Sequence, residues 1–304
     1  MAVTLLAMRA LLYCGFPALL LVGTLGAQPI PARDLLEFPL GAVLEPAALA
    51  AEPGAGLWNP AAGMLRRSDR WRFSVTALTT AQDQGVAGQL LSAAWRRPGG
   101  VTYGASVARA AVSNILRTDT DPQTAGEVPY SSLLASFSVS RDVIPNVTVG
   151  AAARWRQGSA DGDVRHAVAA DLGMLVHDLP WRNARVAVSS FLWRPGHEID
   201  DRPAVLAAVD ARVTGRGTRD LRLGFSYNGV NRGARESGIF SVMNLDLVEA
   251  RAAFLRTSLA GRSLSRIRYG IGLRFAQYVV GIAREEGVSG LGPLYQYSFS
   301  TTLR

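Results

Sequence analysis

The chain has 304 residues, of which 48% are hydrophobic and 18% charged, with 31 Gly, 15 Pro and a single Cys. The low charge and high glycine content exclude a disordered or coiled-coil chain, and the single thiol excludes disulfide frameworks and zinc–cysteine clusters. All 32 basic residues are Arg and the net charge is +8, so the positions of the arginines must decide between nucleic acid, anionic lipid and no particular partner.

Residues 1–27 predict an export signal. Arg9 ends a short basic region, an apolar run extends from Ala10 to Val22, and small residues follow at 23–27. An apolar run of about 13 residues is shorter than the roughly 20 that a spanning helix needs, which disfavours a membrane anchor. We therefore expect the mature chain to lie outside the cytoplasm, without the only cysteine, Cys14.

Residues 28–70 precede the first predicted strand and are rich in Ala, Gly and Pro around Trp58, Asn59 and Pro60. Pro60 disfavours the helical conformation at Asn59, whose side chain can hydrogen-bond the nearby backbone, so this motif predicts a turn. Trp58 is a large apolar side chain that could fill an interior space. The turn is therefore either part of a plug or an ordinary linker.

From residue 71 onward, apolar or aromatic residues alternate with Gly, Ser, Thr and Arg. In one stretch Ile267, Tyr269 and Ile271 alternate with Arg268 and Gly270. Strict alternation predicts strands with one apolar and one polar face. The same pattern recurs within residues 71–77, 101–107, 147–156, 221–228 and 295–303.

The composition of the two faces favours a transmembrane β-barrel over a β-sandwich. A sandwich usually shows many Lys, Glu and Thr to water, whereas here the polar face carries small residues and Arg, as expected of an enclosed lumen. Aromatic residues near strand ends are typical of the girdles at membrane interfaces. They are Trp71, Trp95, Trp155, Trp181, Trp193, Tyr227 and Tyr278.

Turn signals divide residues 71–304 into about fourteen antiparallel strands, an even number, as a bacterial single-chain barrel requires. The tenth span is the weakest, so twelve strands remain the alternative. Short turns such as 97–100 and 276–277 alternate with longer polar links at 113–128, 194–202 and 228–237, and short turns are typical of the periplasmic end. The predicted spans are 71–80, 86–96, 101–111, 129–140, 147–157, 164–177, 185–194, 204–213, 220–228, 238–245, 248–257, 266–275, 278–285 and 293–304.

Many arginines fall on the polar face and are predicted to line the lumen. Charge on the lipid-facing side would be destabilising, so this sorting supports the barrel. The arginines either pair with carboxylates in a buried network, which we favour, or form an anion site. The predicted lumen-lining residues are Arg72, Arg154, Arg156, Asp171, Arg222, Glu249, Arg251, Arg266, Arg268 and Arg274, and Asp210 shares their face.

No catalytic or metal-binding motif is present. His197 lies beside Asp200 and Asp201 in a polar loop, where solvated charge is far commoner than a catalytic dyad or a calcium site. The chain has no Gly-x-Ser-x-Gly, no His-Glu-x-x-His and no phosphate loop. It also has no basic helix or aromatic platform for nucleic acid. We expect neither enzyme activity nor a cofactor.

Three motifs resemble the FadL-type outer-membrane transport barrels, in particular their PorV/PorQ-like branch. The aromatic-Asn-Pro-Ala motif of the N-terminal hatch is matched by Trp58, Asn59, Pro60, Ala61 and Gly63, although Ala62 splits the usual Pro-Ala-Gly run. Asp171-Leu172-Gly173 resembles a mid-barrel strand of that branch, and Gly270-Ile271-Gly272-Leu273 resembles a late one. The resemblance covers nearly the whole mature chain.

The resemblance implies a bacterial outer-membrane barrel (residues 71–304) with a short N-terminal hatch or plug (residues 28–70). Its implied function is passive transport of hydrophobic or amphipathic small molecules. The alternative is a PorV-like, non-enzymatic accessory barrel that binds secreted or surface proteins. Implied partners are outer-membrane lipid and the barrel assembly machinery.

Overall fold

The computed structural model describes residues 30–32, 35, 45–51, 56–65, 70–80, 85–118, 124–194, 204–230, 235–259, 262–286 and 293–303. The predicted signal peptide and the loop residues His197, Asp200 and Asp201 lie outside these ranges. Antiparallel strands dominate, and two short 3-10 helices, η1 (Ala47–Leu49) and η2 (Ala62–Leu65), precede them. In the described part of the chain, no helix is long and apolar enough to cross a membrane.

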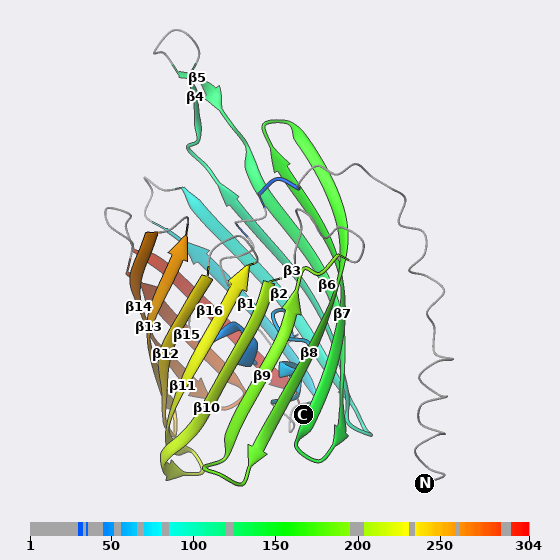
Figure 1. Cartoon of the computed structure of the whole chain (residues 1–304), viewed down its shortest axis with the longest axis vertical. Coiled ribbons are helices and arrows are strands. Elements are labelled where there is room, and N and C mark those ends of the chain that lie inside the picture. Colours follow the sequence, from blue (N-terminus) through cyan, green and yellow to red (C-terminus); the bar gives the residue numbers. More distant parts are fainter. Residues whose placement is uncertain are drawn as a thin grey trace.

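Fourteen strands form a closed antiparallel barrel (Figure 1). The last strand pairs with the first, from Trp71 opposite Leu303 to Thr79 opposite Tyr295. The strands of the barrel are β1 (Trp71–Thr79), β2 (Val86–Arg97), β3 (Val101–Val112), β6 (Tyr130–Ile144), β7 (Val147–Ala160), β8 (Asp163–Leu179), β9 (Ala184–Phe191), β10 (Ala204–Arg216), β11 (Arg219–Val230), β12 (Arg235–Leu245), β13 (Val248–Leu259), β14 (Arg262–Phe275), β15 (Tyr278–Glu285) and β16 (Leu294–Leu303).

The predicted number of strands is confirmed, and the twelve-strand alternative is wrong. The weakest predicted span, 238–245, corresponds to β12, which begins three residues earlier, at Arg235. Two strands continue past their predicted ends through irregularities in the pairing: β6 between Asp142 and Ile144, and β10 between Arg212 and Thr214. These extensions carry bulges, which interrupt strict alternation without ending a strand.

The link between β3 and β6 differs from the expected polar loop. It contains a hairpin of two short strands, β4 (Leu116–Thr118) and β5 (Thr124–Glu127), which pair with each other and not with the barrel. In Figure 1 this hairpin projects beyond the end of the barrel. Three-residue and four-residue strands are too short for a period-two pattern to identify.

The outer face of the wall is apolar, as predicted. On β1, Trp71, Phe73 and Val75 are exposed while Arg72 and Ser74 are buried. Large apolar side chains cover the outer surface, as contact with lipid requires. We call the end of the barrel with the turns at 98–100, 145–146, 217–218, 246–247 and 276–277 the short-turn end.

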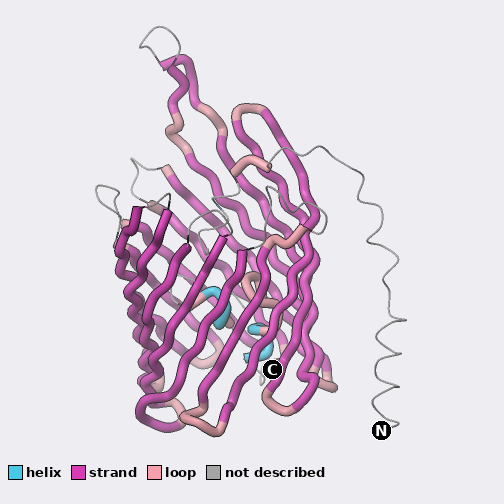
Figure 2. The backbone as a smooth tube through the Cα atoms, viewed as in Figure 1, coloured by secondary structure: helices cyan, strands magenta, loops and turns pink. Residues whose placement is uncertain are grey.

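The described residues of the N-terminal segment lie inside the barrel. Helix η1 contacts β9 and β10, and η2 contacts β3, β6 and β8 on another part of the wall. Figure 2 shows both helices enclosed by the strands. The main buried apolar cluster therefore consists of N-terminal residues and inward-facing residues of the barrel.

Candidate functional site

The turn predicted at Asn59 joins the two parts of the N-terminal segment. The Ala61 N–H donates to Asn59 Oδ1 over 3.0 Å, which closes the turn. Asn59 Nδ2 donates to the Ala48 carbonyl over 2.8 Å, and the side chain is fully buried. The side-chain amide of Asn59 therefore fixes the backbone after Trp58 and hydrogen-bonds it to η1.

Trp58 is buried against the wall at β9. Its ring centroid lies 4.8 Å from that of Phe191, and its carbonyl accepts a 3.0 Å hydrogen bond from Ser189 Oγ. Both partners are inward-facing residues of β9. The aromatic side chain singled out in the sequence therefore contacts the inner wall.

Two inward-facing glycines leave room for the turn. Gly150 on β7 and Gly173 on β8 are register partners. A Cβ at Gly150 would lie 2.6 Å from the carbonyl carbon of Pro60, and one at Gly173 would lie 2.9 Å from Pro60 Cδ and closer still to Asn59 Oδ1. We call this pair the glycine notch. The Asn59–Pro60 backbone fits there because neither position carries a side chain.

Three of the predicted lumen arginines bind the N-terminal segment. Arg72 Nη2 donates to the Gly63 carbonyl over 2.6 Å, and Arg156 Nη2 donates to the Pro31 carbonyl over 2.9 Å. Arg251 forms a 2.8 Å ion pair with Glu45. The sequence suggested only carboxylate pairing or an anion site, so this role was missed.

The other predicted arginines pair with carboxylates on the wall. Arg154 and Asp171 form an ion pair with fully buried side chains, and the Arg154 guanidinium lies 4.8 Å from the Phe191 ring centroid. Asp171 also accepts a 3.1 Å hydrogen bond from the Trp193 N–H. Arg222 binds Asp210 over 2.7 Å, and Arg274 pairs with Glu249.

A four-membered cluster spans β12, β14 and β15. Arg266 Nη1 lies 2.6 Å from Glu285, Arg268 Nη2 lies 3.2 Å from Glu236, and each arginine also pairs with the other glutamate. Sequence reasoning missed Glu236 and Glu285. Glu236 fell in a predicted loop, but the inward position of Glu285, at the end of a predicted strand, was available from the alternation.

The inner wall is less polar than predicted. Leu90, Leu134 and Leu175 face inward and are fully buried, and Leu206 and Phe240 are nearly so. They belong to the same cluster as Leu49, Leu57 and Trp58 of the N-terminal segment. Adjacent apolar residues such as Leu90-Leu91 and Leu133-Leu134 break the alternation and were the available signal.

The described histidines form no metal site. His166 faces outward and stacks on Trp155, with ring centroids 5.3 Å apart. His177 is buried, and its Nδ1 lies 2.9 Å from Asp178. Among the residues that the structure describes, no group of three or more His, Cys, Asp or Glu is arranged to hold a metal ion.

Comparison with known proteins shows the fold. No family model and no curated protein matches the sequence. The solved structure of the "CymD monoaromatic hydrocarbon channel" is similar, with a TM-score of 0.62 and 10% identity, covering 90% of this chain and 97% of that one. The Pseudomonas putida toluene transporter TodX has a TM-score of 0.55 and 11% identity, covering 80% of this chain and 90% of that one. This chain therefore shares the barrel fold of a monoaromatic hydrocarbon channel and of a toluene transporter.

Proposed function

We propose that this chain is a bacterial outer-membrane barrel that lets hydrophobic or amphipathic small molecules cross passively. In this proposal residues 1–27 direct export, residues 28–70 form a plug, and residues 71–304 form the membrane-spanning wall. The short-turn end faces the periplasm, as is usual for such barrels. No catalysis and no cofactor are involved.

The observation that carries the proposal is that inward-facing apolar residues of the wall are buried in one cluster with the N-terminal segment. A barrel for polar solutes needs a wet lumen, but here Leu90, Leu134, Leu175 and Phe240 face inward and are covered by the N-terminal segment. If that segment moves, an apolar surface is uncovered inside the barrel. Such a surface binds apolar solutes because burial removes their apolar area from water.

The N-terminal segment is held to the barrel wall by separate contacts, so it can be released from the wall. Trp58 occupies the position on Phe191 that an aromatic solute would take. The anchors at Arg72, Arg156 and Arg251 are separate hydrogen bonds and ion pairs and not a continuous strand. Each such bond contributes about 1–3 kcal/mol, so the segment can be displaced stepwise.

The similar structures support the same class of substrate. CymD is named as a channel for monoaromatic hydrocarbons and TodX as a toluene transporter. A channel and a transporter among the similar structures also support a non-enzymatic role. The finer assignment to the PorV/PorQ-like branch of FadL-type barrels rests on the sequence motifs alone.

Flux into liposomes tests the proposal. We expect the purified barrel to pass toluene and a fluorescent fatty acid but not a hexose, and Trp58→Ala to raise the hydrophobic flux several-fold because the contact with Phe191 is lost. Trp181→Ala is the matched control, since Trp181 lies in an exposed turn. Absence of hydrophobic flux through the wild type, Trp58→Ala and a chain lacking residues 54–64 would overturn the transport proposal.

A second candidate function follows from the β4–β5 hairpin. An accessory barrel that binds secreted or surface proteins needs a structure that projects from the barrel, and this hairpin projects beyond the barrel's end (Figure 1). Its exposed Leu116 offers an apolar contact. Co-purification of a surface protein with the wild type but not with a chain lacking the hairpin would favour this candidate, and an unchanged co-purification would contradict it.

A further inference from the structure

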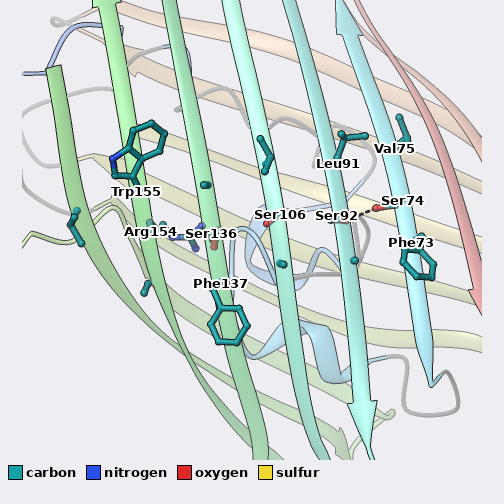
Figure 3. Close-up of a pocket in the computed structure, with 16 residues that line it drawn as sticks. Phe73, Ser74, Val75, Leu91, Ser92, Ser106, Ser136, Phe137, Arg154 and Trp155 are labelled. Atoms are coloured by element: carbon teal, nitrogen blue, oxygen red, sulfur yellow. Dashed lines mark hydrogen bonds between the residues drawn. The ribbon is translucent and has the colours of Figure 1, made fainter. Parts of the chain in front are cut away.

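A groove crosses the outer face of the barrel on β1, β2, β3, β6, β7 and β8. Its volume is about 810 Å³. Figure 3 shows Phe73, Leu91, Phe137 and Trp155 around it, from four different strands. The serines and Arg154 that also border the groove alternate with outward residues and face the lumen, so they contribute backbone at its floor.

Small residues produce the groove. Ala93, Ala105 and Phe137 follow one another across β2, β3 and β6, and Phe73 is the partner of Ala93 on β1. Two adjacent alanines thus lie between two phenylalanines. Two residues further along β6, Ala135 lies between Val107 on β3 and Trp155 on β7. This third alanine continues the groove diagonally across the strands.

An aromatic ladder lies next to the groove, toward the short-turn end. The ring centroids of Trp71 and Trp95 are 5.7 Å apart, and those of Trp95 and Tyr103 are 5.5 Å apart. Amphipathic rings of this kind mark the headgroup level of a membrane. The groove therefore lies in the acyl-chain layer of the leaflet at the short-turn end.

Two exposed arginines lie beyond the aromatic ladder. Arg97 and Arg141 flank Val101 in one row of the outer face and are two residues from the ladder row. Neither side chain has an ion-pair partner among the described residues. They lie four residues from the alanine row, about 13 Å along the strand. A molecule with an apolar chain in the groove would place an anionic head between them.

We propose that the groove binds one anionic phospholipid of the periplasmic leaflet. An acyl chain lies over Ala93 and Ala105, the glycerol region lies at the aromatic ladder, and the phosphate lies between Arg97 and Arg141. A second copy of this chain fits less well. A two-fold axis along the membrane normal keeps every residue at its depth, so arginines would meet arginines. The leaflet rests on the orientation given in the proposed function, whereas the site itself does not require transport.

The test measures phospholipid binding to the full barrel in detergent by native mass spectrometry, with phosphatidylglycerol and phosphatidylcholine as probes. We expect one tightly bound phosphatidylglycerol and much weaker binding of phosphatidylcholine. Arg97→Gln with Arg141→Gln should weaken phosphatidylglycerol binding about 25-fold, at roughly fivefold per arginine. Ala93→Leu with Ala105→Leu should weaken binding of both lipids by filling the groove.

Two controls are available on the same barrel. Arg216→Gln removes another exposed arginine at the short-turn end, and Ala252→Leu enlarges another outward alanine on β13, so both should leave binding unchanged. Equal binding of the two lipids, or no effect of the double glutamine variant, would overturn the proposal. A dimer that dissociates in the double leucine variant would assign the groove to a second copy instead. The two glutamine substitutions change only exposed side chains, so the double glutamine variant should fold. Its phosphatidylglycerol binding therefore tests the proposal even if the double leucine variant does not fold.

Discussion

At the scale of single residues, the absence of a side chain at Gly173 gives a specific prediction. A methyl group there would meet Pro60 Cδ at 2.9 Å, so Gly173→Ala should displace the Asn59 turn and lower the free energy of unfolding by about 1–3 kcal/mol. Limited proteolysis of the N-terminal segment and thermal unfolding would measure both effects. The matched control is Gly272→Ala, since its methyl group would first meet Glu249 Cβ at 3.7 Å. Equal behaviour of the two variants would argue against the glycine notch.

The buried pair of Arg154 and Asp171 gives a second prediction. Arg154→Met leaves a buried carboxylate without its partner, which should destabilise the barrel by about 3–5 kcal/mol. Arg117→Met breaks the pair with Asp161, whose side chains are 51% and 54% exposed, and should change stability by about 0–1 kcal/mol. Urea unfolding in detergent compares them. A double change, Arg154→Met with Asp171→Leu, should recover part of the loss, and its failure to do so would contradict this account.

The sequence predicted carboxylate partners for the inward-facing arginines but not their hydrogen bonds to main-chain carbonyls. Alternation places Arg72 and Arg156 on the inner face because side chains of a strand point to opposite sides in turn. Their partners are backbone carbonyls of Gly63 and Pro31, which are distant in sequence. No local pattern encodes a contact with main-chain atoms, since every residue carries a carbonyl.

At the scale of elements, the positions of the strands were predictable from the sequence. Where a strand's bounds differ from the predicted span, the cause is local. The span predicted at 278–285 matches β15, along which more exposed and more buried residues alternate. The extension of β6 to Ile144 was missed because a bulge near Asp142 shifts the pattern by one residue. The inward-facing apolar residues were missed because alternation alone does not show that a preceding segment returns to cover them.

The β4–β5 hairpin should be dispensable for the barrel. Val112 and Tyr130 are register partners, so β3 and β6 meet directly at the base of the hairpin. Replacing residues 114–128 with a short Gly-containing turn should therefore leave the thermal unfolding midpoint within a few degrees of the wild type. Loss of heat-modifiable migration on a gel would show instead that the hairpin is needed for folding.

At the scale of the whole molecule, charged substitutions on the outer surface test whether the barrel lies in a membrane. Ile271 and Leu247 are 51% and 63% exposed, but Ile271 lies within β14 whereas Leu247 lies in a turn. In lipid, Ile271→Arg should lower stability by about 2–4 kcal/mol, whereas Leu247→Arg should change it by less than about 0.5 kcal/mol. Unfolding of both variants from liposomes measures the difference. Two equally stable variants would indicate that the outer face lies in water.

The two hydrogen bonds from Arg72 and Arg156 to main-chain carbonyls have a consequence for sequence change. A main-chain carbonyl is present whatever side chain its residue carries, so a substitution at Gly63 or Pro31 keeps the acceptor. The ion pair of Arg251 needs one particular carboxylate, that of Glu45. Of these three attachments, the one at Glu45 is therefore the one that a single substitution in the N-terminal segment removes.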